Sequence, residues 1–312
     1  MKVFSEFKKE NINGCDSKWD FATKAMDNYH KILWDYARVI EETDIHSIIL
    51  KEGRVIVELL SGVKLYCREF DSRSMPMDIL NFNEYEKDQM HVIYKILTKL
   101  EHRNIIDIGA NIGYTSCSWA KQFTDAKIWA YEPIKSTYEL LVDNVNLNNC
   151  SSRIVTCNVG ISDKNMETDF YFYPWCTANT SINNLQHRKD AVIEHARLNR
   201  LDDREELKKV SIDFIKCDVE GNELFVIEGA HDIIEKNLPI ISIEILRKYS
   251  KEFGYEANDV VRSIKKYGYS LYCVRYGNLV EIEEISDDTK ETNFIFMHRD
   301  KHQKLLEVLD AE

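Results

Sequence analysis

Short apolar runs alternate with longer amphipathic segments from residue 84 onward. The short runs have the length and composition of strands buried on both faces of a sheet, whereas apolar residues in the longer segments recur every three or four positions, as in helices. The predicted strands are Asn104–Ile108, Lys127–Glu132, Arg153–Val159, Ile212–Asp218, Pro239–Ile245, Tyr269–Tyr276 and Asn293–His298. This alternation predicts an α/β fold, a doubly wound and mostly parallel seven-stranded sheet that ends in an antiparallel pair.

The first 83 residues follow a different pattern. Over the first forty residues, apolar side chains recur at mixed three- and four-residue steps, which predicts helices that form a surface hairpin or a dimerisation arm. Residues 46–69 predict a small β-meander with turns at Gly53 and Gly62. We therefore expect a helical segment with a short β-meander over 1–83 and a catalytic domain over 84–312.

Three helix boundaries can be predicted from capping patterns. Asn83 with Glu86, and Ser136 with Glu139, have the spacing of a capping box at a helix start. Gly229 follows an amphipathic segment and is expected to end that helix.

The composition excludes several classes of protein. The formal charge is −12, and no basic stripe is present, so we expect no nucleic-acid partner. No run of about 18 apolar residues occurs, which argues against a membrane span. The charged first residues lack the apolar stretch of a secretory signal, so we expect a cytoplasmic protein. Eight cysteines without a C-x-x-C pair indicate reduced thiols rather than a disulfide framework or zinc site.

The turn after the first predicted strand of the sheet is the first candidate ligand site. It reads Asp107, Ile, Gly109, Ala, Asn111, Ile, Gly113. A dinucleotide fingerprint needs glycine at the first, third and sixth positions, but Asn111 and Tyr114 occupy the last two. The chain also lacks the G-K-[ST] of a nucleoside-triphosphate loop. The turn therefore does not have the glycines of a phosphate cradle.

S-adenosylmethionine (SAM) explains this departure because it carries an ammonium and a sulfonium but no pyrophosphate. We expect Asp107 to attract the methionine end, and Asn111 to offer a hydrogen-bonding side chain. Gly109 would permit the tight turn, and Gly113 would let the following helix approach the strand.

The ends of the next two strands carry further candidate SAM ligands. Glu132, 25 residues after Asp107, can accept hydrogen bonds from both ribose hydroxyls. Asn158 can bind the adenine edge through its amide, and Val159 can flank the adenine ring.

Two sequence motifs resemble the FkbM family of SAM-dependent methyltransferases. They are N-I-I-D-I-G-A-N-I-G at 104–113 and I-D-F-I-K-C-D-V-E-G-N-E at 212–223, together with Glu132-Pro133, and the likeness covers roughly 84–245. The resemblance implies a class I, Rossmann-like methyltransferase domain. It also implies O-methylation of sugar or polyketide-type hydroxyls, such as those of a nucleotide-linked sugar or of a glycan or polysaccharide precursor.

Carboxylates at the ends of the fourth and fifth strands are the candidate catalytic groups. In one arrangement Asp218 or Glu220 accepts the hydroxyl proton directly, with Lys216 close by. In the other, Asp218 and Glu244 hold a divalent ion such as Mg²⁺, which lowers the pKa of the acceptor hydroxyl. We favour the metal-free arrangement, because Lys216 can neutralise the carboxylates.

His187 is a further candidate base. It lies in the insertion between the third and fourth strands, which we expect to cover the site and to bind the acceptor, a small molecule or glycan. Two other functions stay open: an RNA or DNA methyltransferase on the same fold, and a SAM-binding scaffold without turnover. The N-terminal helices offer a surface for a homodimer.

Overall fold

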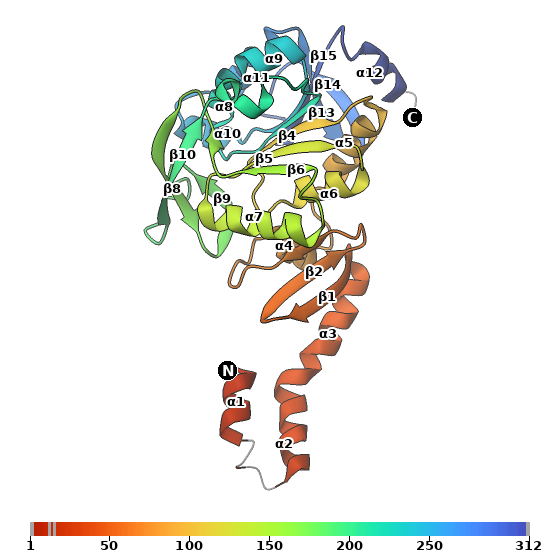
Figure 1. Cartoon of the computed structure of the whole chain (residues 1–312), viewed down its shortest axis with the longest axis vertical. Helices are drawn as coiled ribbons and strands as arrows, with labels where there is room; N and C mark the ends of the chain where they lie inside the picture. Colours follow the sequence, from red (N-terminus) through yellow and green to blue (C-terminus); the bar gives the residue numbers. More distant parts are fainter. Residues whose placement is uncertain (1–2, 12–13, 15–16, 310–312) are drawn as a thin grey trace.

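The main sheet has eight strands (Figure 1). The structure is a computed structural model, and it describes residues 3–11, 14 and 17–309. In spatial order the strands are β14 (Asn278–Ile282), β13 (Tyr269–Arg275), β15 (Asn293–His298), β12 (Ile240–Glu244), β11 (Phe214–Cys217), β4 (Asn104–Ile108), β5 (Lys127–Tyr131) and β6 (Ile154–Cys157). The five strands from β12 to β6 are parallel, and β15, β13 and β14 are antiparallel.

All seven predicted strands belong to this sheet, but the expected number of strands was one too low. The extra strand, β14, pairs only with β13 across a turn at Tyr276 and Gly277. It lies at the edge, and its five residues are all exposed or half-buried, so its sequence lacks the apolar run of an interior strand.

Helices cover both faces of the main sheet, which explains why its parallel strands are apolar throughout. Ile105 packs in one core with the first group of helices, and its neighbour Ile106 packs in the other core with the second group. The first group is α5 (Lys87–Lys99), α6 (Tyr114–Gln122), α7 (Lys135–Leu147) and α12 (Gln303–Leu309). The second group is α8 (Glu223–Gly229), α9 (His231–Asn237) and α11 (Ala257–Lys265), and α10 (Arg247–Glu252) precedes α11.

Both predicted capping boxes are wrong. Asn83 ends helix α4 (Met75–Phe82) in a left-handed conformation with φ 75°, which asparagine tolerates better than most residues. Ser136 lies inside α7, and the Glu132 side chain instead accepts a hydrogen bond from Ile134 N at the start of this helix. The prediction for Gly229 is confirmed, since α8 ends there.

The N-terminal helices project away from the rest of the molecule (Figure 1). They are α1 (Phe4–Asn11), α2 (Lys18–Ala25), the π-helical η1 (Met26–His30), α3 (Lys31–Val39) and the short 3₁₀ helix η2 (Ile40–Glu42). Helix α1 packs on the α2–η1 segment through aromatic rings, with Phe7 5.5 Å from Phe21 and 5.0 Å from Tyr29 between centroids. The predicted helical pattern is confirmed.

The predicted meander consists of three strands, β1 (Ile45–Lys51), β2 (Arg54–Leu59) and β3 (Lys64–Tyr66). Strand β3 lies along α7, where the side chains of Asn144 and Asn148 bind its main chain. Val57 and Leu65 belong to the same hydrophobic core as α5 and α6. The domain boundary at residue 83 stays a prediction, and the meander shares its core with the domain that follows.

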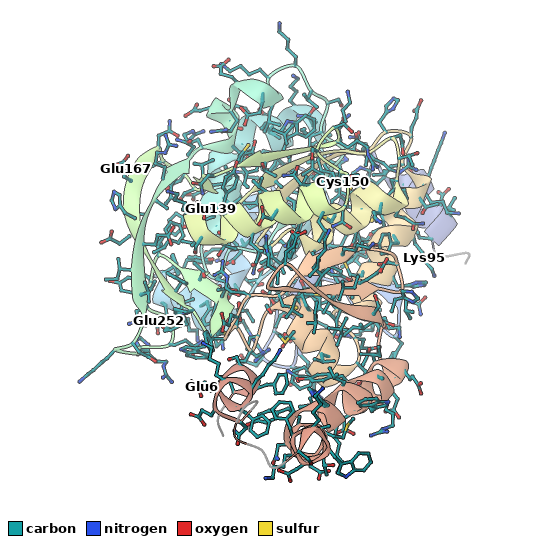
Figure 2. All side chains as sticks on the ribbon, turned by 60° about the horizontal axis from the view of Figure 1, so that its bottom comes forward. Glu6, Lys95, Glu139, Cys150, Glu167 and Glu252 are labelled. Atoms are coloured by element: carbon teal, nitrogen blue, oxygen red, sulfur yellow. The ribbon has the colours of Figure 1, made fainter. Side chains whose placement is uncertain are left out.

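The insertion between β6 and β11 forms a second sheet, which the sequence did not reveal. Its strands are β7 (Gly160–Ile161), β10 (Val192–Asn199), β8 (Met166–Tyr173) and β9 (Cys176–Ser181), in that spatial order, and the 3₁₀ helices η3 (Leu201–Asp203) and η4 (Glu205–Leu207) follow β10. Figure 2 shows this sheet, marked by Glu167, at the outer edge beside α7, marked by Glu139. The Lys135 N–H donates to Glu194 Oε1 at 2.6 Å and joins α7 to β10.

Within the described residues, no helix has the length and apolar character needed to cross a membrane. The seven described cysteines are free thiols, and Cys15 lies outside the described residues.

Candidate functional site

A cavity lies at the carboxyl ends of β4, β5 and β11. It encloses about 1140 Å³ of empty space, with the open solvent at its mouth included. Three parts of the chain form its walls: the turns of the main sheet, the segment 73–86 and the insertion sheet. The lining of the cavity includes Arg73, Asp78, Tyr85, Glu86, Gly109, Asn111, Glu132, Thr177, Lys216, Asp218 and Glu220.

The Gly109 turn is held tightly against the end of β11. Gly109 has φ 77°, and a Cβ atom placed on it would lie 1.8 Å from the carbonyl oxygen of Asp218. Both features require glycine, since a side chain would be strained and would also clash with main chain. The candidate SAM turn and the candidate base are therefore neighbours in one wall.

Asn111 presents an unsatisfied oxygen at the cavity. Its main chain is left-handed, with φ 49°, and its N–H donates to Glu132 Oε2 at 3.0 Å. Its Oδ1 atom is buried and has no hydrogen-bond partner among the described residues. A buried oxygen of this kind is costly unless a ligand or water donates to it, so this position suits a ligand with a hydrogen-bond donor.

Gly113 has a different role from the one predicted. Its φ is 84°, and a Cβ atom there would lie 2.4 Å from Leu141 Cδ1 on α7. The glycine therefore lets α6 approach α7, rather than a strand, and Gly113 does not line the cavity.

Glu132 joins two turns while facing the cavity. Its carboxylate accepts hydrogen bonds from the N–H groups of Asn111 and Ile134, at 3.0 and 2.9 Å. Burial raises its pKa to about 7, although these two hydrogen bonds oppose the shift. Each oxygen keeps a lone pair, so the expected ribose contact is compatible with the geometry and stays a prediction.

Asp107 lies one layer behind the cavity. It is fully buried, its Oδ2 accepts from Ser116 Oγ at 2.6 Å, and its Oδ1 lies 3.7 Å from Lys216 Nζ. Burial raises its pKa, and Lys216 and Ser116 oppose that rise. The cavity lining does not include Asp107, so its predicted role at the methionine end would be exerted through these neighbours.

Asn158 and Val159 lie outside the cavity lining as well. The Asn158 amide donates to the carbonyl oxygens of Glu132 and Pro133, at 3.0 and 2.9 Å, and so holds the turn after β5. Val159 is buried in the hydrophobic core. The adenine contacts expected of this pair stay predictions.

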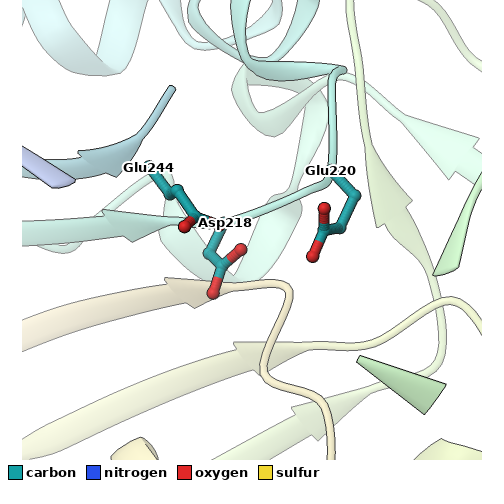
Figure 3. A group of neighbouring side chains, drawn as sticks. All are labelled: Asp218, Glu220 and Glu244. Carbon is teal, nitrogen blue, oxygen red and sulfur yellow. The ribbon is translucent and has the colours of Figure 1, made fainter. Parts of the chain in front are cut away.

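Four charged side chains meet at the ends of β11 and β12. Lys216 Nζ lies 3.2 Å from Asp218 Oδ2, and the side chains of Glu220 and Glu244 lie on either side of Asp218 (Figure 3). Burial lowers the pKa of Lys216, but the carboxylates of Asp218 and Asp107 outweigh this effect and leave it raised. Lys216 is therefore an ammonium that pairs with Asp218.

The other carboxylates of this cluster favour their protonated forms. Burial, followed by repulsion from Asp218, raises the pKa of Glu220 well above its usual value and that of Glu244 to about 10. The same two causes raise the pKa of Glu86. The Asp218 side chain is about one-third exposed, so a substrate in the cavity can reach it.

The cluster also has the donors of a cation site. Carboxylate oxygens of Asp218, Glu220 and Glu244 all lie within 4.8 Å of one another. Oxygen donors are those that Mg²⁺ prefers, and Oε2 of Glu220 is buried without a hydrogen-bond partner in the described structure. The structure thus adds Glu220 to the Asp218–Glu244 pair considered from sequence, and metal dependence stays open.

His187 is remote from this cluster in its contacts. It lies in an exposed turn with φ 49°, and its Nε2 lies 3.4 Å from Glu252 Oε1. The cavity lining does not include it. Its assignment as a base stays a prediction that this geometry does not support.

Sequence reasoning missed the wall formed by Arg73, Asp78, Tyr85 and Glu86. These residues precede the first strand of the main sheet and match no motif, and Glu86 was interpreted as part of a helix cap. Glu86 and Tyr85 nevertheless interact electrostatically with Asp218 across the cavity. The signal available in the sequence was only the density of charged and aromatic residues before α5.

Comparison with known proteins identifies the family. The profile of the methyltransferase FkbM domain matches residues 107–271. Methyltransferase sdnD of Sordaria araneosa is 28% identical over 158 residues, which cover 41% of this chain and 60% of that protein. Hexuronic acid methyltransferase AglP of Haloferax volcanii is 25% identical over 198 residues, which cover 63% of this chain and 78% of that protein.

A crystal structure of a methyltransferase FkbM from Methylobacillus flagellatus KT is also similar. Its TM-score is 0.43 at 14% identity, and the match covers 87% of this chain and 60% of that one. The family profile spans more than half of the 312 residues and includes the turn at Gly109 and the acidic cluster. The chain belongs to the FkbM methyltransferase family.

Proposed function

We propose that this protein is a SAM-dependent O-methyltransferase that acts on a hydroxyl group of a sugar. The observation that carries the proposal is the close packing of Gly109 against the carbonyl oxygen of Asp218, which brings these two residues into one wall. The family membership supports methyl transfer. The relative AglP, named as a hexuronic acid methyltransferase, supports a sugar as the acceptor.

The residues that would hold SAM are Gly109, Asn111 and Glu132. The unsatisfied Oδ1 of Asn111 fits such a ligand, and Gly109 permits the tight turn beside it. SAM, when bound, supplies a methyl group on a positively charged sulfur. Glu132 offers acceptor lone pairs for hydroxyl groups on the ribose.

Asp218 is the proposed base. Its carboxylate would hold a sugar hydroxyl and take its proton, while SAM would supply the methyl group and leave as the neutral thioether. Lys216, 3.2 Å away, orients Asp218. A positioned base contributes about 10²–10⁴-fold, and alignment of the two reactants contributes about 7–11 kcal/mol.

The direct test uses methyl-labelled SAM, the purified chain and a panel of nucleotide sugars and glycans, with the product located by mass. We expect label on a sugar oxygen with the wild-type chain and very little with Asp218→Asn. SAM binding without transfer to any acceptor would favour a binding module over an enzyme. Binding of NAD in place of SAM would contradict the proposal.

The same assay decides the role of a metal. If Lys216 alone provides the positive charge, turnover survives rigorous chelation with EDTA. Loss of turnover that Mg²⁺ restores would instead assign Asp218, Glu220 and Glu244 as the ligands of a divalent ion, which would supply Lewis acidity at the acceptor hydroxyl.

A further inference from the structure

The charges that line the cavity are unevenly distributed. Among the described lining residues, only two are positively charged, Arg73 and Lys216, against five carboxylates. The five are Asp78, Glu86, Glu132, Asp218 and Glu220. The Lys216 side chain is only 15% exposed and forms ion pairs with Asp218 and Asp107, whereas the Arg73 side chain is 56% exposed. Arg73 therefore carries the accessible positive charge of this part of the cavity.

The guanidinium of Arg73 is held in a defined orientation. Its Nε and Nη2 atoms donate to the two carboxylate oxygens of Asp78 on α4, at 3.0 and 3.5 Å. This two-point contact uses one edge of the planar group and leaves Nη1 without a contact to Asp78. A guanidinium oriented in this way can bind a second anion with little further loss of freedom.

The main chain that carries Arg73 is fixed to the insertion sheet. Asp71, which is buried, accepts a hydrogen bond from Arg73 N through Oδ1 and one from Thr177 Oγ1 on β9 through Oδ2. The N–H and hydroxyl of Ser72 both donate to the carbonyl oxygen of Trp175, each at 3.1 Å. These hydrogen bonds hold the loop in place as part of the cavity wall.

Arg73 lies on the acceptor side of the cavity. It interacts electrostatically with Tyr85, and Tyr85 in turn interacts with Asp218 and Glu244. Arg73, Tyr85 and the proposed base Asp218 line the same cavity.

We propose that Arg73 binds an anionic group of the sugar acceptor, a carboxylate or a phosphate, and so makes the enzyme selective for charged sugars. This inference rests on the proposed function. Arg73 lies outside the family match at 107–271, so this selectivity belongs to the chain's own N-terminal segment.

The test compares four acceptors with methyl-labelled SAM: a hexuronic acid, its methyl ester, a hexose 1-phosphate and the neutral hexose. We expect the wild-type chain to favour at least one anionic acceptor by about 10–100-fold in kcat/KM, mostly through KM. Arg73→Met should abolish this preference, so that the anionic acceptors and the neutral hexose react with similar kcat/KM. The acid and the phosphate distinguish the two sources of the anion.

Two further variants make the result interpretable. Arg275 makes the same two-point contact to a carboxylate, with Glu291 at 2.6 and 3.3 Å, but it lies outside the cavity lining. Arg275→Met should therefore keep the preference for anionic acceptors. Arg73→Met leaves the Asp78 carboxylate without its partner, which the double variant Arg73→Met, Asp78→Asn avoids. If the single variant folds correctly, the two variants should have the same acceptor preference.

Each contrary result has its own meaning. Equal rates with the acid, its ester, the phosphate and the hexose in the wild-type chain would overturn the selectivity and leave sugar methylation intact. If the preference for anionic acceptors survives Arg73→Met, another residue binds the anion and the role proposed for Arg73 is wrong. Transfer to none of the sugars would overturn the proposed function, and this inference with it.

Discussion

The two halves of the cavity are built in different ways. The proposed cofactor half consists of turns at the ends of β4 and β5, where Gly109 packs on the Asp218 main chain and the Asn111 N–H donates to the Glu132 carboxylate. The acceptor half collects side chains from segments that are distant in sequence, such as Arg73 and Glu220. The first half is therefore local and depends on backbone shape, whereas the second depends on how the N-terminal segment and the insertion sheet pack on the main sheet.

We expect the largest effect from a substitution of Asp218, where the two halves of the cavity meet. Asp218→Asn removes the proposed base but preserves the shape of the side chain, so we expect kcat to fall by about 10²–10⁴-fold. SAM affinity should change by less than about threefold, because the contact with Gly109 uses the main chain of Asp218. Single-turnover kinetics and calorimetry measure the two quantities. A matching loss of SAM affinity would mean that the halves are not separable.

Gly109→Ala should damage the cofactor half specifically. The added Cβ meets the Asp218 carbonyl at 1.8 Å, so the turn must move, and we expect SAM affinity to fall by about 100-fold. Gly277→Ala is the matched control, because φ there is 74° but no atom lies within 4 Å of the added Cβ. Calorimetric titration with SAM compares the two variants. Similar affinities in both would show that any loss comes from the strained positive φ alone and not from the clash with Asp218.

Glu132 should make SAM binding depend on pH. Its pKa is raised to about 7, so the carboxyl is protonated below this pH and becomes the acceptor for ribose hydroxyls above it. SAM affinity should therefore increase by up to about tenfold between pH 6 and 8. In Glu132→Gln this increase should disappear, with affinity near the low-pH value. Isothermal titration at three pH values checks the slope, and an unchanged slope in the variant would point to another group, such as Glu223, whose pKa burial also raises to about 7.

His187 should have the smallest effect. Its side chain is 71% exposed and contacts Glu252 rather than the acidic cluster. We expect His187→Ala to retain at least half of the wild-type kcat and the same pH profile. A loss of more than about tenfold in an acceptor assay would restore it as a base and would require the insertion to move over the cavity.

Much of the fold was predictable from sequence, and the reasons are physical. Seven strands of the main sheet were identified because strands buried on both faces are apolar throughout. Strand β14 and the insertion sheet were missed because their residues are half-exposed and carry no continuous apolar run. The capping boxes failed because Asn83 ends α4 and because Glu132, rather than Ser136, accepts a hydrogen bond at the start of α7.

The candidate site was predictable only where it is local. Gly109, Asn111, Glu132 and Asp218 were identified from turns at strand ends, and all four line the cavity. Asn158 occupies a comparable position, but its amide is used to hold a turn. A strand end shows where a side chain begins and not whether it faces the ligand.

The sequence alone determined the family, seven of the eight strands of the main sheet and the glycine turn at Gly109, because each depends on residues that are neighbours along the chain. Only the tertiary structure placed Arg73, Tyr85 and Glu86 opposite Asp218, buried Asp107 behind Lys216 and brought Glu220 beside Glu244. These arrangements arise from packing between segments far apart in the chain, and burial and electrostatic coupling exist only after that packing has formed.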